Sequence, residues 1–149
     1  MTRDELATVL AYMPSFERAQ AAAAFGADWT PARVADELLA GHFPRYLLED
    51  SGDPLAAGGL FPKGGGVWEG WVFASRECRR RASMESLSRV CRNGIAWAFA
   101  HGAYRIEAFH LADQPRVHAW LESLGLKRAQ ELPRYGRGGE DFVRFEVTA

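Results

Sequence analysis

The sequence lacks several features that would place it in a specialised class of proteins. It has only two cysteines, Cys78 and Cys91, which are too few for a disulfide framework or a four-cysteine zinc site. No apolar run approaches the ~20 residues of a membrane-spanning helix. Asp4 and Glu5 stand where a signal peptide has its apolar core. We therefore expect a cytoplasmic protein with reduced thiols and no membrane contact.

An excess of charge of either sign is also absent. The net charge is −1, which gives no indication of a nucleic-acid partner. What is present is typical of a globular protein, with 48% apolar and 25% charged residues. A chain of 149 residues fits one domain, so we expect residues 1–149 to fold as a single unit.

The order of helical and strand-like segments predicts the fold class. Helical spacing of apolar residues and capping residues predict three helices, over 2–13, 15–25 and 30–41. Later segments predict strands over 45–49, 55–61, 67–74 and 104–109, helices over 83–101 and 115–124, and a closing hairpin of 128–133 and 141–147. The strand–helix–strand unit predicts parallel pairing of 67–74 with 104–109. We expect an α+β fold, a mixed and mostly antiparallel sheet with helices on both faces.

The helix over 115–124 has the clearest pattern. Val117, Trp120, Leu121 and Leu124 form one apolar stripe at helical spacing, and Gly125 is placed to end the helix in a left-handed conformation. By itself this pattern indicates a packing element.

The same stretch, QPRVHAWLESLGL (114–126), carries a family resemblance. Together with the order of elements it resembles the GNAT superfamily of N-acetyltransferases, whose helix has the motif N-x-x-A-x-x-x-Y-x-x-x-G-F. The resemblance spans roughly residues 30–147, and the N-terminal helices replace or precede the superfamily's first strand. HAWLESLGL and PRYGRGGEDFVRFE (133–146) look closest to GNAT-like proteins of short-tailed bacteriophages.

The resemblance implies a site and its ligands. It implies acetyl-CoA as cofactor and an amine, on a small molecule or a protein, as acceptor. Glu69 corresponds to the carboxylate that takes the proton of the amine and is the catalytic candidate. The positions that correspond to contacts with acetyl-CoA are Val72, Phe73 and Ala74 for the backbone pairing with pantetheine, Arg79, Arg80, Arg81, Ala82 and Ser83 for the phosphate loop, and Gln114 for the amide of the helix motif.

Two departures weaken the implied chemistry. Ser83 and Glu85 replace the glycines of the phosphate loop, and a carboxylate in that turn repels pyrophosphate. The tyrosine that often serves as general acid falls on Leu121, which has no proton to donate. The arginines Arg76 and 79–81 form either an anion site, a solvated face, or a patch for DNA or an acidic protein.

Two functions therefore stay open. The first is an acetyl-CoA-dependent N-acetyltransferase. The second is a non-catalytic phage protein of the same fold, which binds phage structural proteins or host proteins and resides in the host cytoplasm or the virion. His110, His118 and Asp113 match no standard metal-site spacing, so we expect no metal.

Overall fold

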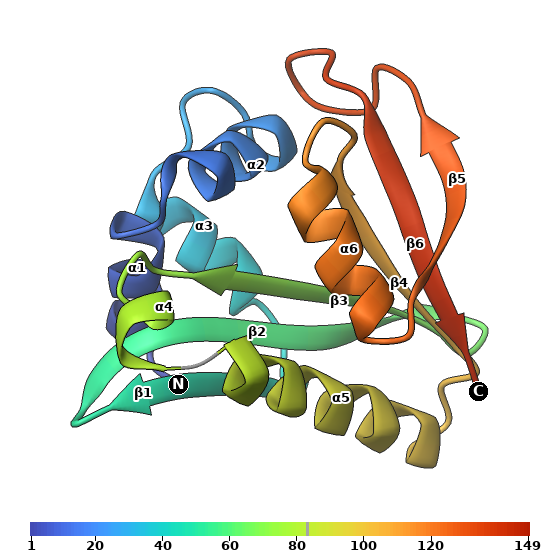
Figure 1. Ribbon diagram of the computed structural model, residues 1–149, viewed down its shortest axis with the longest axis horizontal. Coiled ribbons are helices and arrows are strands. Elements are labelled where there is room, and N and C mark those ends of the chain that lie inside the picture. Colours follow the sequence, from blue (N-terminus) through green and yellow to red (C-terminus); the bar gives the residue numbers. More distant parts are fainter. Residues whose placement is uncertain (83) are drawn as a thin grey trace.

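The computed structural model describes residues 1–82 and 84–149, which form a six-stranded sheet with helices on both faces (Figure 1). The α+β prediction is therefore confirmed. The helices are α1 (Arg3–Ala11), α2 (Ser15–Phe25), α3 (Pro31–Leu38), α4 (Cys78–Arg81), α5 (Met84–Ala100) and α6 (Pro115–Ser123). The strands are β1 (Arg45–Asp50), β2 (Asp53–Gly64), β3 (Val67–Ala74), β4 (Arg105–Leu111), β5 (Lys127–Leu132) and β6 (Phe142–Thr148).

Helices α1 to α3 cover one face of the sheet. The predicted capping box starts α1, because the Thr2 hydroxyl accepts from the Glu5 N–H and the Glu5 carboxylate accepts from the Thr2 N–H. The apolar stripe of α1 packs with Val34 of α3 on Ala57 and Phe73 of the sheet. Ala23 of α2 packs on β4 and β6 through Leu111 and Phe142.

Helices α5 and α6 cover the opposite face. Leu87 of α5 packs on Leu55 and Ala56 of β2, and Leu121 of α6 packs on Val143 and Phe145 of β6. The closing hairpin is present, but β6 lies between β4 and β5 in the strand order β1-β2-β3-β4-β6-β5. Helices therefore lie on both faces of the two halves of the sheet.

The two halves of the sheet separate between β3 and β4. These strands are parallel, as predicted, but they pair only over Val67–Glu69 and Arg105–Glu107. Beyond Glu69, β3 stays with β2 up to Ala74, and β4 stays with β6 up to Leu111. Figure 1 shows the resulting V between β3 and β4, with α2 and α6 on either side of it.

The sequence-based boundaries differ from the structure in a few places. Strand β2 is longer than predicted, because its hairpin with β3 continues to a turn in which Gly65 and Gly66 have positive φ. The short helix α4 was not predicted. Ser83, assigned to the phosphate loop, lies outside the described residues. Within the described ranges, every helix is too short or too polar to cross a bilayer.

Candidate active site

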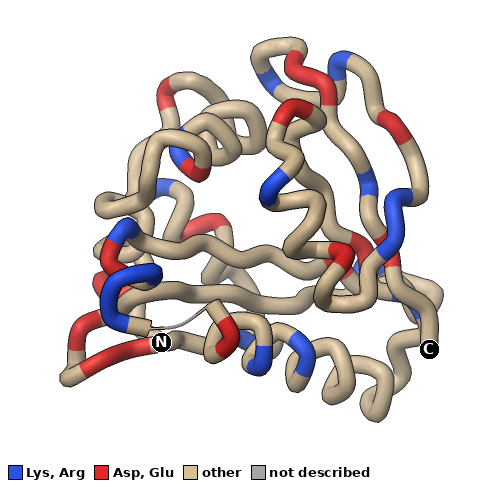
Figure 2. Tube along the Cα trace, in the orientation of Figure 1, with Lys and Arg blue, Asp and Glu red and all other residues tan. Residues whose placement is uncertain are grey.

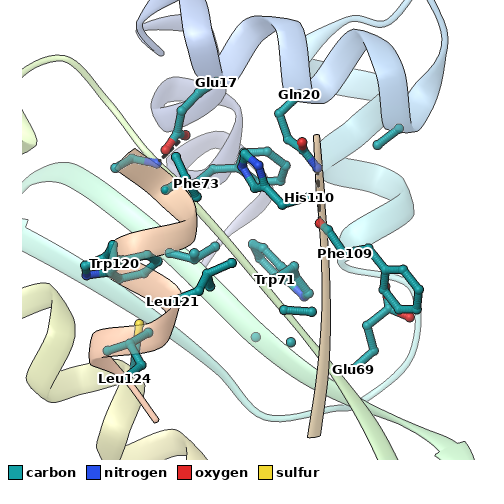
Figure 3. A pocket seen from close by; sticks show the side chains of 18 of the residues that line it. Glu17, Gln20, Glu69, Trp71, Phe73, Phe109, His110, Trp120, Leu121 and Leu124 are labelled. Carbon is teal, nitrogen blue, oxygen red and sulfur yellow. Dashed lines mark hydrogen bonds between the residues drawn. The ribbon is translucent and has the colours of Figure 1, made fainter. Parts of the chain in front are cut away.

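A cavity of about 670 Å³ lies where β3 and β4 separate. Its walls are mostly apolar and come from β3, β4, α2, α5 and α6. Figure 3 shows Trp71 of β3 within it, Trp120 and Leu121 of α6 on one side, and Glu17 and Gln20 of α2 directed toward it. The cavity therefore joins both faces of the opened sheet.

Two polar side chains of α2 bond to the two open strand edges. Glu17 Oε2 accepts a hydrogen bond from the Ala74 N–H of β3 at 2.8 Å. One helical turn later, Gln20 accepts from the Leu111 N–H of β4 at 3.0 Å and donates to the Phe109 carbonyl at 3.3 Å. Buried backbone groups need partners of this kind. Helix α2 thus supplies hydrogen bonds that the separated strands do not make with each other.

The Glu17 carboxylate is poorly solvated. Burial raises the pKa of Glu17 to about 7, although the Ala74 N–H and the charge of Arg79 act to lower it. Among residues 1–82 and 84–149, no ion pair to Glu17 is found, and Oε1 has no hydrogen-bond donor. The charge of Glu17 is therefore balanced by the Ala74 N–H and by the more distant Arg79.

At the narrow end of the cavity, Glu69 has a cation in contact. Lys63 Nζ lies 3.4 Å from Glu69 Oε2 and 3.1 Å from Glu107 Oε2. Burial raises the pKa of Glu69, and Lys63 offsets part of that rise. Glu69 lines the cavity on the same strand face as Trp71 and Phe73, as the alternation in the sequence predicts. The carboxylate is thus presented at the point where the strands part.

The arginines of the predicted phosphate loop separate into two groups. Arg81 is paired with Asp50 at 2.9 Å and with Asp53 at 2.7 Å, and Arg80 is paired with Glu77 at 3.2 Å. Arg79 instead lines the cavity, with its guanidinium 5.5 Å from the centre of the Phe16 ring. Figure 2 shows the basic α4 beside the acidic turn between β1 and β2.

Of the four arginines, Arg76 and Arg79 line the cavity, whereas Arg80, Arg81 and the adjoining Ala82 are not part of its lining. The predicted cluster is therefore divided, with part of its charge directed to Asp50, Asp53 and Glu77.

The predicted pantetheine contacts also differ from one another. Val72, Phe73 and Ala74 all line the cavity. Backbone groups of alternate strand residues point to the same edge, so those of Val72 and Ala74 face the opening and those of Phe73 face β2. Gln114 is outside the lining, and its Nε2 donates to the Phe16 carbonyl at 2.9 Å. Gln114 therefore ties α6 to α2.

His110 lines the cavity as a neutral imidazole. Burial lowers the pKa of His110 to about 4. His118 is buried behind it, with Nε2 2.8 Å from the Leu111 carbonyl oxygen. Within the described part of the chain, no three His, Cys, Asp or Glu side chains are grouped as metal ligands.

The residues that α2 and the loop between β5 and β6 contribute to the cavity were not predicted from the sequence. Tyr135 of that loop lines the cavity and stacks on Phe109, with 5.6 Å between ring centroids. Glu17 and Gln20 belong to no motif. Their only signal in the sequence is a polar pair one turn apart in an alanine-rich helix.

Solved structures of N-acetyltransferases are similar to this chain over nearly its whole length. The ribosomal-protein-alanine N-acetyltransferase from Brucella melitensis matches with a TM-score of 0.75 and 15% identity, covering 100% of this chain and 97% of that one. An N-acetyltransferase from Staphylococcus aureus matches with a TM-score of 0.70 and 17% identity, covering 99% and 94%.

The ribosomal-protein-S18-alanine N-acetyltransferase from Escherichia coli matches with a TM-score of 0.68 and 18% identity, covering 99% of this chain and 89% of that one. No family model and no curated protein matches the sequence. The structural matches establish that the chain has the GNAT acetyltransferase fold.

Proposed function

We propose that this protein is an acetyl-CoA-dependent N-acetyltransferase that binds its acetyl donor between β3 and β4. The observation that carries the proposal is the 670 Å³ cavity at the separation of these strands in a chain with the GNAT fold. The similar structures support it, because their names describe N-acetyltransferases. The acceptor would be an amine on a small molecule or a protein, and the reaction would take place in the cytoplasm.

The residues present fit one part of acetyl-CoA better than another. The backbone N–H and C=O of Val72 face the cavity, and the cavity walls are mostly apolar. This combination suits the amide-bearing pantetheine arm. The phosphate end is less complete, since only Arg76 and Arg79 of the arginine cluster line the cavity. We therefore assign phosphate binding to these two residues, and Ala82 and Gln114 to supporting positions.

Glu69 is the group we assign to proton transfer. Acetyl-CoA supplies an activated acetyl thioester when bound. The Glu69 carboxylate would take the proton of the acceptor ammonium at Oε1, directly or through water, because Oε2 faces Lys63. Leu121 lines the cavity but donates no proton, so the transfer would rely on positioning of the reactants and on Glu69.

Calorimetry with acetyl-CoA tests the proposal, with two neighbouring arginines as a matched pair. We expect binding to the wild type, a loss on the order of tenfold in Arg79→Ala, and no change in Arg80→Ala. The difference follows from their positions, since Arg79 lines the cavity and Arg80 is paired with Glu77. Absence of binding at millimolar acetyl-CoA would refute the enzyme, and equal losses in both variants would refute the phosphate assignment.

The second candidate is a non-catalytic protein of this fold that acts through protein contacts. Two observations favour it: Glu17 already occupies the Ala74 N–H, and Arg81 is bound to Asp50 and Asp53. Its phage form, a virion or assembly protein, is supported by the resemblance of residues 118–126 and 133–146 alone. Recovery of the protein in purified particles, together with no binding of acetyl-CoA, would favour this candidate. Turnover of acetyl-CoA would exclude it.

A further inference from the structure

Helix α2 spans the V-shaped opening and bonds to both of its edges. Glu17 and Gln20 lie one turn apart, so they leave the same side of the helix. Glu17 reaches Ala74 on β3, and Gln20 reaches Phe109 and Leu111 on β4. Figure 3 shows Glu17 and Gln20 directed from α2 toward the cavity. Gln20 is held to β4 more firmly than Glu17 is held to β3, since Gln20 makes two hydrogen bonds and Glu17 makes one.

The helix itself is held at several other points. The Gln114 side chain donates to the Phe16 carbonyl at 2.9 Å, at the start of α2. The Arg137 N–H donates to the Ala23 carbonyl at 2.8 Å, near its end. With the two bonds of Gln20, these contacts fix α2 to α6, to β4 and to the loop between β5 and β6. Moving α2 as a body would break all of them, whereas rotating the Glu17 side chain would break only one hydrogen bond.

The Glu17 contact lies on the strand edge that the proposed donor would use. Val72 and Ala74 direct their backbone groups into the opening, and Ala74 is already bonded to Glu17. An extended ligand with amide groups, laid along β3, would place a carbonyl oxygen where it accepts a hydrogen bond from the same Ala74 N–H. Two titratable groups of the neighbouring α4 interact electrostatically with Glu17. Burial raises the pKa of Glu17 and the Arg79 charge acts to lower it, while burial and the Glu17 charge raise the pKa of the Cys78 thiol.

We propose that Glu17 closes the β3 edge of the cavity and that the pantetheine arm of acetyl-CoA displaces it from the Ala74 N–H, while α2 stays in place. This inference rests on the proposed function. It makes Glu17 a competitor of the donor: the carboxylate satisfies the Ala74 N–H when no ligand is present, and it lowers the affinity for the ligand by the free energy of the bond that must be broken.

Calorimetric titration of the intact protein with acetyl-CoA at pH 8 tests the competition. Glu17→Ala frees the Ala74 N–H, and we expect it to bind acetyl-CoA about tenfold more tightly than the wild type. Glu17→Gln keeps an oxygen acceptor without the charge, so we expect an intermediate affinity. Glu122→Ala, on the exposed side of α6, is the matched control and should bind as the wild type does.

Hydrogen exchange on the same wild-type complex tests whether α2 stays in place. We expect the amides of residues 15–25 to keep their protection when acetyl-CoA binds. Faster exchange across α2 would overturn the stationary helix. Equal or weaker binding by both Glu17 variants would overturn the competition while leaving the proposed function intact. No binding by any of the four proteins would overturn the proposed function and the inference together.

Discussion

Glu69 and Glu17 are two glutamates that line the same cavity, and the protein stabilises them in different ways. Glu69 has the Lys63 ammonium 3.4 Å away, within a network that also holds Glu107. Glu17 has a backbone N–H at 2.8 Å and, among the described residues, no ion-pair partner. Burial raises the pKa of both carboxyls, and for Glu17 it reaches about 7.

The difference shows how environment assigns roles to chemically identical side chains. A carboxylate with a cation in contact keeps its charge and its position, which suits a group that must receive a proton. A carboxylate held by one N–H is readily displaced by another acceptor. At the narrow end of the cavity the Glu69 carboxylate therefore has a lysine in contact. At the end near α2 the Ala74 N–H is bonded only to a side chain that a ligand can displace.

The largest expected effect comes from removing the charge at the centre of the Glu69 network. Glu107 is buried, and its carboxylate contacts Lys63 at 3.1 Å and Arg105 and Arg144 at 3.0 Å each. Burial acts to raise the pKa of Glu107, but the three cations together lower it by more, so the pKa lies below its usual value. Glu107→Gln should reduce the free energy of unfolding by about 3 kcal/mol, measured by urea denaturation at pH 7.

The matched control for that change is Glu131→Gln. Glu131 has an exposed side chain, and its ion pair with Arg128 spans 3.5 Å, so its loss should cost less than about 0.5 kcal/mol. Because the pKa of Glu107 is depressed in the folded state, its contribution is present at neutral pH and is lost as the pH falls through that depressed value. Equal losses in the two variants would show that the network adds nothing to stability.

An effect of about the same size, but opposite in sign, is expected at Glu17. Its pKa is about 7 in the folded protein and about 4.5 when unfolded, so the folded state binds more protons between these values. Stability from this group is therefore present below pH 4.5 and is lost as the pH rises to 7. Glu17→Gln keeps an acceptor for Ala74 and should gain about 3 kcal/mol over the wild type at pH 8, and nothing at pH 4.5.

Thermal and urea unfolding at the two pH values measure this difference. Glu122→Gln, an exposed carboxylate on α6, should follow the wild type at both. A Glu17→Gln variant that is less stable than the wild type at pH 8 would contradict the poor solvation of this carboxylate.

The smallest effect is expected from removing the cation beside Glu69. Lys63→Met keeps an apolar chain over the Phe109 ring, from which Lys63 Nζ is 4.7 Å distant, but it removes the charge that lowers the pKa of Glu69. The acidic limb of the pH–rate profile for acetyl transfer, where the rate rises as Glu69 loses its proton, should move to higher pH. Lys127→Met on β5 should leave the profile unchanged, and an unshifted profile in Lys63→Met would remove Glu69 from the proton-transfer role.

Much of the fold was predictable because its signals are local. The stripe of Val117, Trp120, Leu121 and Leu124 predicts α6, and Leu121 does pack on β6. The parallel pairing of β3 and β4 follows from the helix between them. The helix α4 was missed because its four residues, Cys78–Arg81, are too few to show a period.

The candidate site was predictable only in part. The resemblance assigns roles to Glu69 and to the edge of β3; both line the cavity, and their roles stay predictions. It grouped Arg79, Arg80 and Arg81 as one phosphate loop, whereas Arg81 binds acidic residues of β1 and β2. Ion pairs of this kind depend on which surfaces meet in three dimensions, and a linear motif holds no record of them.

By itself the sequence determined every element except α4, the order of those elements and the α+β class, because periodicity and capping act over a few neighbouring residues. Only the tertiary structure decided which groups meet at the opening of the sheet. Glu17 is 57 residues from Ala74, and Gln20 is 91 residues from Leu111. These contacts form because two strands part and their buried edges require hydrogen-bond partners, which the nearest packed helix provides.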